Sequence, residues 1–285
     1  MVTGWLIMLL SPLSHMKRMI RKLLRPGLPL AGYSEYRSKI LHIELLKDEE
    51  LQDLNLLLEW NCFVVDSRGR RFGNVAWEGK RIAPQEVPDR RIVLMNERFD
   101  LSDKHVLEVG CFEGIHTVGL SMFAQKVTAI DSRIENVVKT IVRCAMFGCS
   151  PVVFKHDVEE QAANTKMPEV DVVHHVGVLY HLQDPVGHLI ELGRCARSGI
   201  MLDTHYCREE EARDEYEVGG KCYRYKKYGE SGYQDVFSGM YDHAKWLRLD
   251  DIRMVLREAG FGRVDEFETR QERNGPRVLL FAERG

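Results

Sequence analysis

The feature that most constrains the fold is an apolar strand that runs directly into a turn with two glycines. Residues 106–114 read Val-Leu-Glu-Val-Gly-Cys-Phe-Glu-Gly, and a helical pattern begins at Ile115. Glycine lets the backbone approach a ligand closely, and the amide groups that open the next helix point outward. The bulky Phe112 stands where dinucleotide folds need a small residue beside the pyrophosphate. The turn therefore predicts a ligand site in an α/β fold and disfavours NAD.

After this turn, short β-branched segments alternate with helical stretches, as in an α/β domain with a parallel sheet. We expect strands at residues 106–109, 126–130, 151–155, 170–176 and 199–203. We expect helices at residues 115–123, 133–147, 185–196 and 249–259. Two further strands, 262–267 and 277–283, are separated by a short turn-rich link and should pair antiparallel. The pattern predicts a Rossmann-like, doubly wound, mostly parallel sheet with a C-terminal antiparallel hairpin.

An N-terminal extension of helical and irregular character precedes this domain. Residues 41–58 carry leucines at helical spacing with at least one break, and residues 60–90 contain glycines and prolines that suit short strands and turns. We therefore divide the chain into an arm and cap, residues 1–95, and an α/β domain, residues 96–285.

The first 25 residues combine an apolar run with a cationic stretch. Trp5–Leu10 is too short to span a bilayer, which needs about 20 apolar residues, and its charges follow it, unlike those of a secretory signal. Met16–Leu24 places apolar and basic residues at near-helical spacing, which suits an interfacial membrane helix or an arm packed on protein. Seven cysteines without a Cys-x-x-Cys pair favour reduced thiols. We expect a cytoplasmic protein. Its N-terminal arm could also bind peripherally to the inner face of the membrane.

Acidic side chains follow two more of the expected strands. Asp131 ends the second strand, where its carboxylate can accept both hydroxyls of a ribose. Asp157 follows the third strand and can accept the exocyclic amine of an adenine. Because the carboxyl ends of parallel strands meet at one edge of a sheet, these acids should share a crevice with the glycine turn.

With these motifs the chain resembles the class I S-adenosylmethionine-dependent methyltransferases over residues 101–203 and 246–283. The segment Val-Gly-Val-Leu-Tyr-His at 176–181 is similar to methyltransferase-fold enzymes that modify wobble uridine in tRNA, and equally to bacterial methyltransferases of sugars and surface polysaccharides. The resemblance implies S-adenosylmethionine as cofactor. The cofactor-binding residues that it implies are Glu108, Gly110, Cys111, Phe112, Gly114, Asp131, Ser132, Asp157, Val158, Val176 and Tyr180.

Methyl transfer is an in-line displacement, so the protein has to align the acceptor atom and exclude water. A hydroxyl acceptor must also lose a proton, and His181, directly after the fourth strand, is our first candidate for the base. Asp203 and His205, at the end of the fifth strand, are the competing pair. They could also hold a divalent cation, but two ligands are a weak signal, and we predict no metal.

Residues 206–240 form an insertion rich in aromatic and basic side chains. Tyrosine rings stack on sugars or bases, and cations hold phosphate groups, so we expect the insertion to cover the acceptor. A packed lid or a dimer contact is the alternative. The residues concerned are Tyr206, Tyr216, Tyr223, Tyr225, Tyr228, Tyr233, Phe237, Lys221, Arg224, Lys226 and Lys227.

The net charge of the chain helps to predict the class of methyl acceptor. Acidic residues number 43 and basic residues 40, so the chain lacks the positive balance of a dedicated nucleic-acid binder. We therefore predict O-methylation of a sugar or glycan hydroxyl. Modification of tRNA wobble uridine and a non-catalytic cofactor-binding scaffold are the alternatives, and the oligomeric state stays open.

Overall fold

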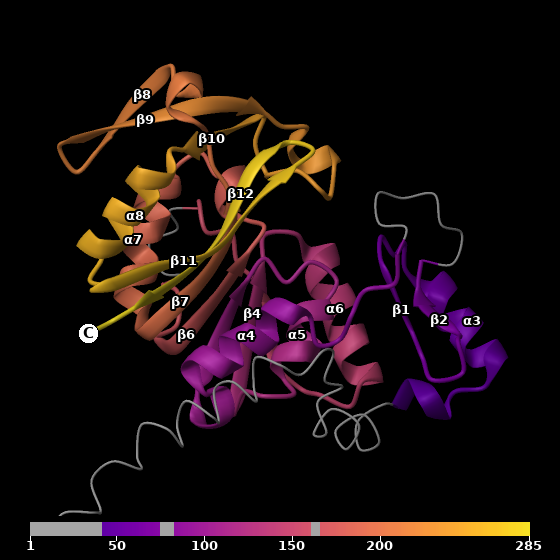
Figure 1. Cartoon of the computed structure of the whole chain (residues 1–285). Helices are drawn as coiled ribbons and strands as arrows, with labels where there is room; N and C mark the ends of the chain where they lie inside the picture. The colour runs from indigo at the N-terminus through magenta and orange to yellow at the C-terminus, as the bar shows by residue number, and fades with distance from the viewer. Residues whose placement is uncertain (1–41, 75–82, 161–165) are drawn as a thin grey trace, which may run out of the picture. The chain divides into compact units, whose positions relative to one another are not determined.

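A seven-stranded sheet organises the structure, a computed structural model that describes residues 42–74, 83–160 and 166–285 (Figure 1). In spatial order its strands are β11 (Arg263–Glu272), β12 (Gly275–Glu283), β7 (Ala196–His205), β6 (Val170–Val176), β3 (His105–Val109), β4 (Lys126–Asp131) and β5 (Val152–Lys155). The strands from β7 to β5 are parallel, whereas β12 runs antiparallel to β7 and β11 antiparallel to β12. The predicted mostly parallel sheet with a C-terminal hairpin is confirmed.

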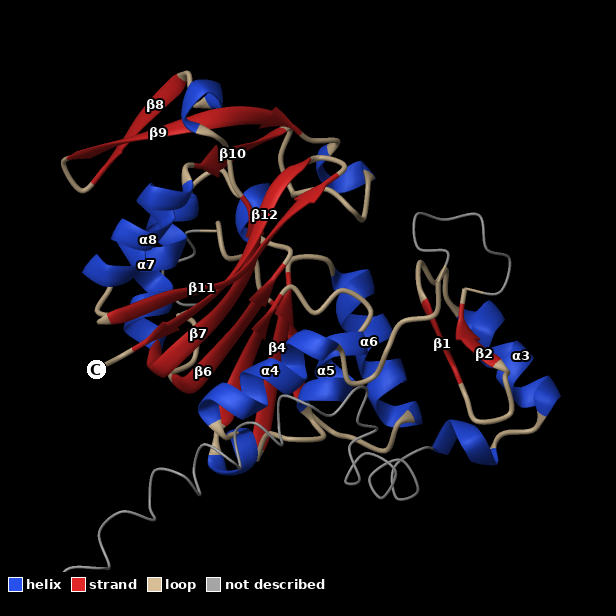
Figure 2. Cartoon of the chain, in the orientation of Figure 1, coloured by secondary structure: helices blue, strands red, loops and turns tan. Residues whose placement is uncertain are grey.

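Helices cover both faces of this sheet (Figure 2). The four predicted helices are α5 (Ile115–Leu120), α6 (Ile134–Met146), α7 (Pro185–Cys195) and α8 (Leu249–Glu258), each ending within three residues of its expected bounds. Alternate residues of β3 serve the two faces: Val106 packs with α4 (Arg90–Phe99) and α5, while Leu107 packs with α7 and α8. Helices therefore shield both faces of the sheet from water, as is usual for a parallel sheet.

The sequence analysis missed α4. Its first turn is capped by Asp89, whose side chain accepts a hydrogen bond from the Arg91 amide, and Ile92 and Met95 are buried one turn apart. An acidic cap ahead of apolar residues at i and i+3 was a readable helix signal. The predicted C-terminal strands were also too short, because β11 and β12 extend up to a turn at Arg273 and Asn274.

The insertion forms a second, three-stranded antiparallel sheet. Its strands are β8 (Asp214–Val218), β9 (Lys221–Gly229) and β10 (His243–Leu247), in the order β10-β9-β8. It therefore runs past the expected end at residue 240. The Lys245 amide donates to the Leu182 carbonyl, which ties β10 to the short helix η3 (Leu179–His181) after β6.

The segment before α4 contains η1 (His42–Leu45), α3 (Asp48–Leu57) and a hairpin of β1 (Phe63–Val65) with β2 (Arg71–Gly73). This arrangement confirms the broken helix and the short strands expected there. The arm with Trp5–Leu10 and Met16–Leu24 lies outside the described residues. Among the residues described, no helix has the length and apolar character needed to cross a membrane.

A buried carboxylate joins this segment to the glycine turn. Glu113 accepts hydrogen bonds from the Asn61 amide at 2.7 Å and the Cys62 amide at 3.0 Å. The same carboxylate lies 3.2 Å from Lys139 Nζ and 3.6 Å from an Arg143 nitrogen, both buried on α6. The Glu113 carboxylate therefore has hydrogen-bond donors in the N-terminal segment and positive charges on α6. The two buried cations, in turn, depend on its negative charge.

Replacing Glu113 with Gln should lower the free energy of unfolding by about 3–5 kcal/mol, because it removes a buried counter-charge of Arg143 and leaves Lys139 to the half-exposed Glu135. Glu135→Gln is the matched control: Glu135 also pairs with Lys139, but its side chain is 51% exposed, and the loss should stay within about 1 kcal/mol. Urea unfolding of both variants measures this difference. Equal losses would contradict the assigned role of Glu113.

Candidate functional site

A cavity of about 610 Å³ lies at the carboxyl ends of β3, β4 and β6. This is where ligands bind in open α/β sheets, and the volume falls in the range of small-molecule sites. The glycine turn, the residues after β4 and β5, η3 and part of the insertion line it. The predicted strand ends with the glycine turn, Asp131 and Asp157 therefore do meet in one cavity.

The turn between β3 and α5 has the tight geometry that its glycines imply. Gly110 has φ of 76°, and a Cβ there would lie 2.4 Å from a methyl carbon of Val178. At Gly114, with φ of 79°, a Cβ would lie 2.9 Å from the Thr140 Cα. Phe112 also adopts a left-handed conformation, with φ of 50°, which is uncommon for a bulky residue. Both glycines are thus required by close approach as well as by backbone angle.

Asp131 holds Phe112 in this conformation. Its carboxylate accepts hydrogen bonds from the Phe112 amide at 2.9 Å, the Arg133 amide at 2.9 Å and Asn136 Nδ2 at 3.0 Å. Burial raises the pKa of Asp131, against the opposing effect of these bonds. A carboxylate offers about four acceptor positions, so roughly one remains for a ligand. Asp131 lines the cavity, and its contact with a ribose stays a prediction.

The other residues implied for the cofactor surround the same space. Asp157 lines the cavity after β5, and its Oδ1 accepts the Glu159 amide at 3.0 Å. Gly114 shapes the turn without lining the cavity. The remaining cofactor residues that line it are Glu108, Gly110, Cys111, Phe112, Ser132, Val158, Val176 and Tyr180.

His181 lines the cavity from η3 and pairs with a buried carboxylate. Its Nδ1 lies 2.7 Å from Glu230 Oε1, and the Glu230 side chain is 4% exposed. Burial opposes the charge of Glu230, but hydrogen bonds from His181 and from Ser238 outweigh it and lower the pKa of Glu230. With Nδ1 engaged, Nε2 is the nitrogen left for an acceptor. Sequence reasoning missed Glu230, which lies 49 residues further on, in the insertion.

Asp203 and His205 do not line the cavity. Asp203 is fully buried among Arg91, Arg270 and Arg277, with Arg270 Nη2 at 2.9 Å. Burial opposes its charge, but these arginines lower the pKa of Asp203, which makes it a weak base. His205 stacks on Trp246 at 4.9 Å between ring centroids. Arginines also occupy the space around Asp203 that a shared cation would need, so the structure does not support the competing pair.

The insertion reaches the cavity through one loop and not through its tyrosines. Val236–Met240 line the cavity, and the Phe237 ring lies 5.5 Å from that of Phe112. Arg133, two residues after Asp131, donates to backbone carbonyls of this loop, among them Gly232 at 3.1 Å. Tyr216 instead packs against Tyr223 and Tyr225. The tyrosine-rich stretch is mainly a packed layer, and loop 232–240 is the part that closes the site.

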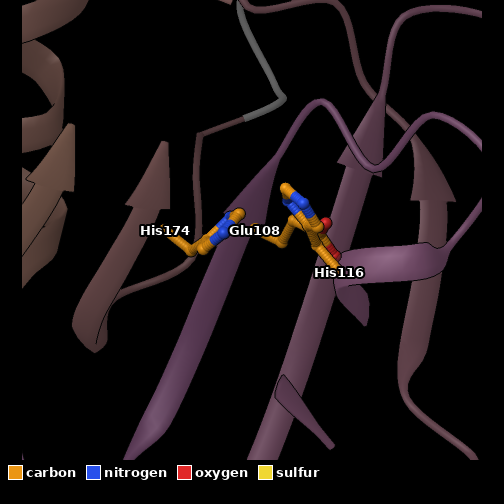
Figure 3. Close-up of side chains that lie close together, drawn as sticks. All are labelled: Glu108, His116 and His174. Carbon is orange, nitrogen blue, oxygen red and sulfur yellow. The ribbon is translucent and has the colours of Figure 1, made fainter. Parts of the chain in front are cut away.

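One group of side chains beside the cavity has the composition of a metal site (Figure 3). Glu108, His116 and His174 each offer a ligand atom, and these atoms lie within 4.8 Å of one another. Burial raises the pKa of Glu108 to about 8, although a hydrogen bond from Thr117 Oγ1 opposes the rise. The sequence analysis assigned Glu108 to the cofactor and did not single out either histidine.

Comparison with known proteins gives relatives of two kinds, and no family model matches the chain. A tRNA U34 carboxymethyltransferase of Methylococcus capsulatus is 35% identical over 117 residues, which are 40% of this chain. The match spans only 36% of that curated relative.

Solved structures match over far more of the chain. The N-terminal domain of EvdMO1 with S-adenosylhomocysteine bound has a TM-score of 0.70 at 22% identity, covering 84% of this chain and 98% of that one. The same domain in the presence of S-adenosylhomocysteine and D-fucose has a TM-score of 0.65, covering 83% and 95%. The chain therefore has the class I methyltransferase fold that its sequence motifs predict.

Proposed function

We propose that the chain is a cytosolic S-adenosylmethionine-dependent methyltransferase that transfers the methyl group to a sugar hydroxyl. The observation that carries this proposal is His181, which lies on the wall of a cavity formed by the strand ends and pairs with the buried Glu230 behind it. The seven cysteines all lie in the described ranges, and none of them forms a disulfide there, which suits a reducing compartment.

The residues around the cavity suit this cofactor. The glycine turn brings backbone amides to the cavity, and Asp131 and Asp157 offer carboxylates at neighbouring strand ends. The EvdMO1 domain, which shares the fold, is solved with S-adenosylhomocysteine bound. When bound, S-adenosylmethionine supplies a methyl group on a sulfonium that becomes a neutral thioether on transfer. Loop 232–240, held by Arg133, would exclude water from that reaction.

His181 can take the proton that a hydroxyl acceptor loses. In the neutral ring, Nδ1 carries the hydrogen that faces Glu230, and Nε2 then has a lone pair for the acceptor proton. The Glu230 carboxylate fixes this tautomer and stabilises the imidazolium that forms. Tertiary contacts hold the carboxylate itself, because it also accepts from Ser238 Oγ and from the Gly239 amide. This pair argues against a non-catalytic scaffold.

A sugar suits the polar residues that line the cavity. Arg270, Glu268 and Glu272 are among them and offer donors and acceptors for hydroxyl groups, and Tyr180 adds an aromatic ring. D-fucose was present with the EvdMO1 domain. Modification of tRNA is the second candidate, because the curated relative at 35% identity acts on tRNA U34.

Asp131→Asn should weaken binding of S-adenosylhomocysteine by about 1–3 kcal/mol, because it removes a charged acceptor from the cavity and loosens Phe112. Isothermal titration calorimetry measures the affinity. Asp100→Asn is the control, since Asp100 caps a short helix outside the cavity. Unchanged affinity in a folded Asp131→Asn protein would remove this residue from the cofactor site.

His181→Ala should lower kcat about 10²–10⁴-fold while leaving cofactor affinity unchanged, as loss of a general base does. Glu230→Gln should lower kcat less, because it removes the carboxylate that orients the His181 ring but leaves the ring in place. Asp242→Asn is the matched control: it alters an exposed carboxylate 2.7 Å from His243 in the same insertion. A Glu230→Gln protein that keeps the wild-type kcat would refute the pair.

The dependence of acceptor binding on salt concentration distinguishes a tRNA acceptor from a sugar acceptor. A tRNA held through several phosphates would lose affinity steeply between 50 and 200 mM salt, by about 10³–10⁵ for 6–10 contacts. A neutral sugar acceptor should show KM nearly independent of salt over this range. Methylation of tRNA with that steep dependence, and none of nucleotide sugars or glycans, would overturn the sugar assignment.

A further inference from the structure

A buried polar cluster lies under the cavity, on the face of the sheet that α4 and α5 cover. Glu108 on β3 and His174 on β6 are Cα partners in neighbouring strands, so their side chains point to the same face. His116, in the first turn of α5, adds a ring whose centroid lies 5.0 Å from that of His174. Figure 3 shows the three side chains directed toward one another.

His174 lacks the partners that a buried imidazole requires. The residue is 1% exposed, and neither Nδ1 nor Nε2 has a hydrogen-bond partner within the described part of the chain. Leaving both nitrogens unpaired is costly, so a group absent from the protein itself should occupy this position. Glu108, also 1% exposed, accepts from Thr117 Oγ1 at 2.5 Å and is otherwise turned toward the histidines.

The surroundings resemble those of a metal-binding histidine. Asp89 Oδ2 lies 3.5 Å from His116 Nε2, and a carboxylate in that position commonly orients an imidazole whose other nitrogen binds a metal. Arg91 Nη2 also approaches His116 Nε2, at 3.2 Å, but its charge is balanced by ion pairs with Asp89 and Asp203. Glu108 and His116 line the cavity, which gives an ion a path from solvent.

We propose that Glu108, His116 and His174 bind one divalent transition-metal ion, with Zn²⁺ the best match to two imidazoles and one carboxylate. Such a donor set is typical of zinc sites. The ligand atoms now lie within 4.8 Å of one another, and side-chain rotation would bring them to about 3.4 Å, the spacing for tetrahedral bonds of about 2.1 Å. The ion would join β3, β6 and α5 beneath the cofactor cavity. The inference is independent of the proposed methyl transfer.

The test is metal binding by the full chain without cofactor. Chelator-treated protein is titrated with Zn²⁺ by calorimetry, and with Co²⁺ for its absorption spectrum. We expect one ion per chain and Co²⁺ d–d bands without a thiolate charge-transfer band, which excludes capture by the exposed Cys222. His174→Asn should weaken Zn²⁺ binding at least about tenfold, and Asp89→Asn about tenfold.

His105→Asn is the matched control, because His105 lies on the same strand as Glu108 but bonds Thr128, and its Zn²⁺ affinity should equal that of the wild type. Equal affinity of the wild type and His174→Asn would overturn the proposal. If His174→Asn does not fold, the Co²⁺ spectrum of the wild type decides instead. Absence of d–d bands would overturn the proposal as well.

Discussion

The structure depends most on the turn from Gly110 to Gly114, because three parts of the molecule meet there. Its glycines allow the close approach of Val178 on one side and Thr140 on the other, which brings backbone to the cavity. Its one buried carboxylate, Glu113, binds the amides ahead of β1 and two cations on α6. A change in this turn would therefore affect the cofactor cavity and the N-terminal hairpin together.

Two parts of the chain form the walls of the cavity. Parallel strands that end at the same edge supply one wall, on which Asp131 and Asp157 lie. The insertion supplies the other wall through loop 232–240, which Arg133 holds by its carbonyls. Since Arg133 follows Asp131 closely in the chain, the loop is fastened directly beside the proposed cofactor site. The proposed cofactor contact and the loop that covers the proposed acceptor side thus depend on the same short segment.

The three candidate bases, Asp203, His205 and His181, are distinguished by their surroundings and not by their residue type. Asp203 is surrounded by arginines, and His205 is stacked on Trp246, so both serve packing and charge balance. His181 faces the cavity and has one carboxylate partner, Glu230, which leaves a nitrogen for chemistry. The same distinction applies to His174, which is as buried as Asp203 but lacks any hydrogen-bond partner among the described residues. That difference is the reason why His174 indicates a bound ion, whereas Asp203 does not.

The sequence by itself determined the sheet, its parallel core and the strand ends that line the cavity, because hydrophobic periodicity and glycine spacing are local properties. It also identified His181, which follows a strand directly. Only the tertiary structure decided which partners these residues have. Glu230 is 49 residues from His181, Arg277 is 74 residues from Asp203, and His116 is 58 residues from His174, whose ring it contacts. Contacts of that kind form when distant segments pack together, and no local pattern in the chain encodes them.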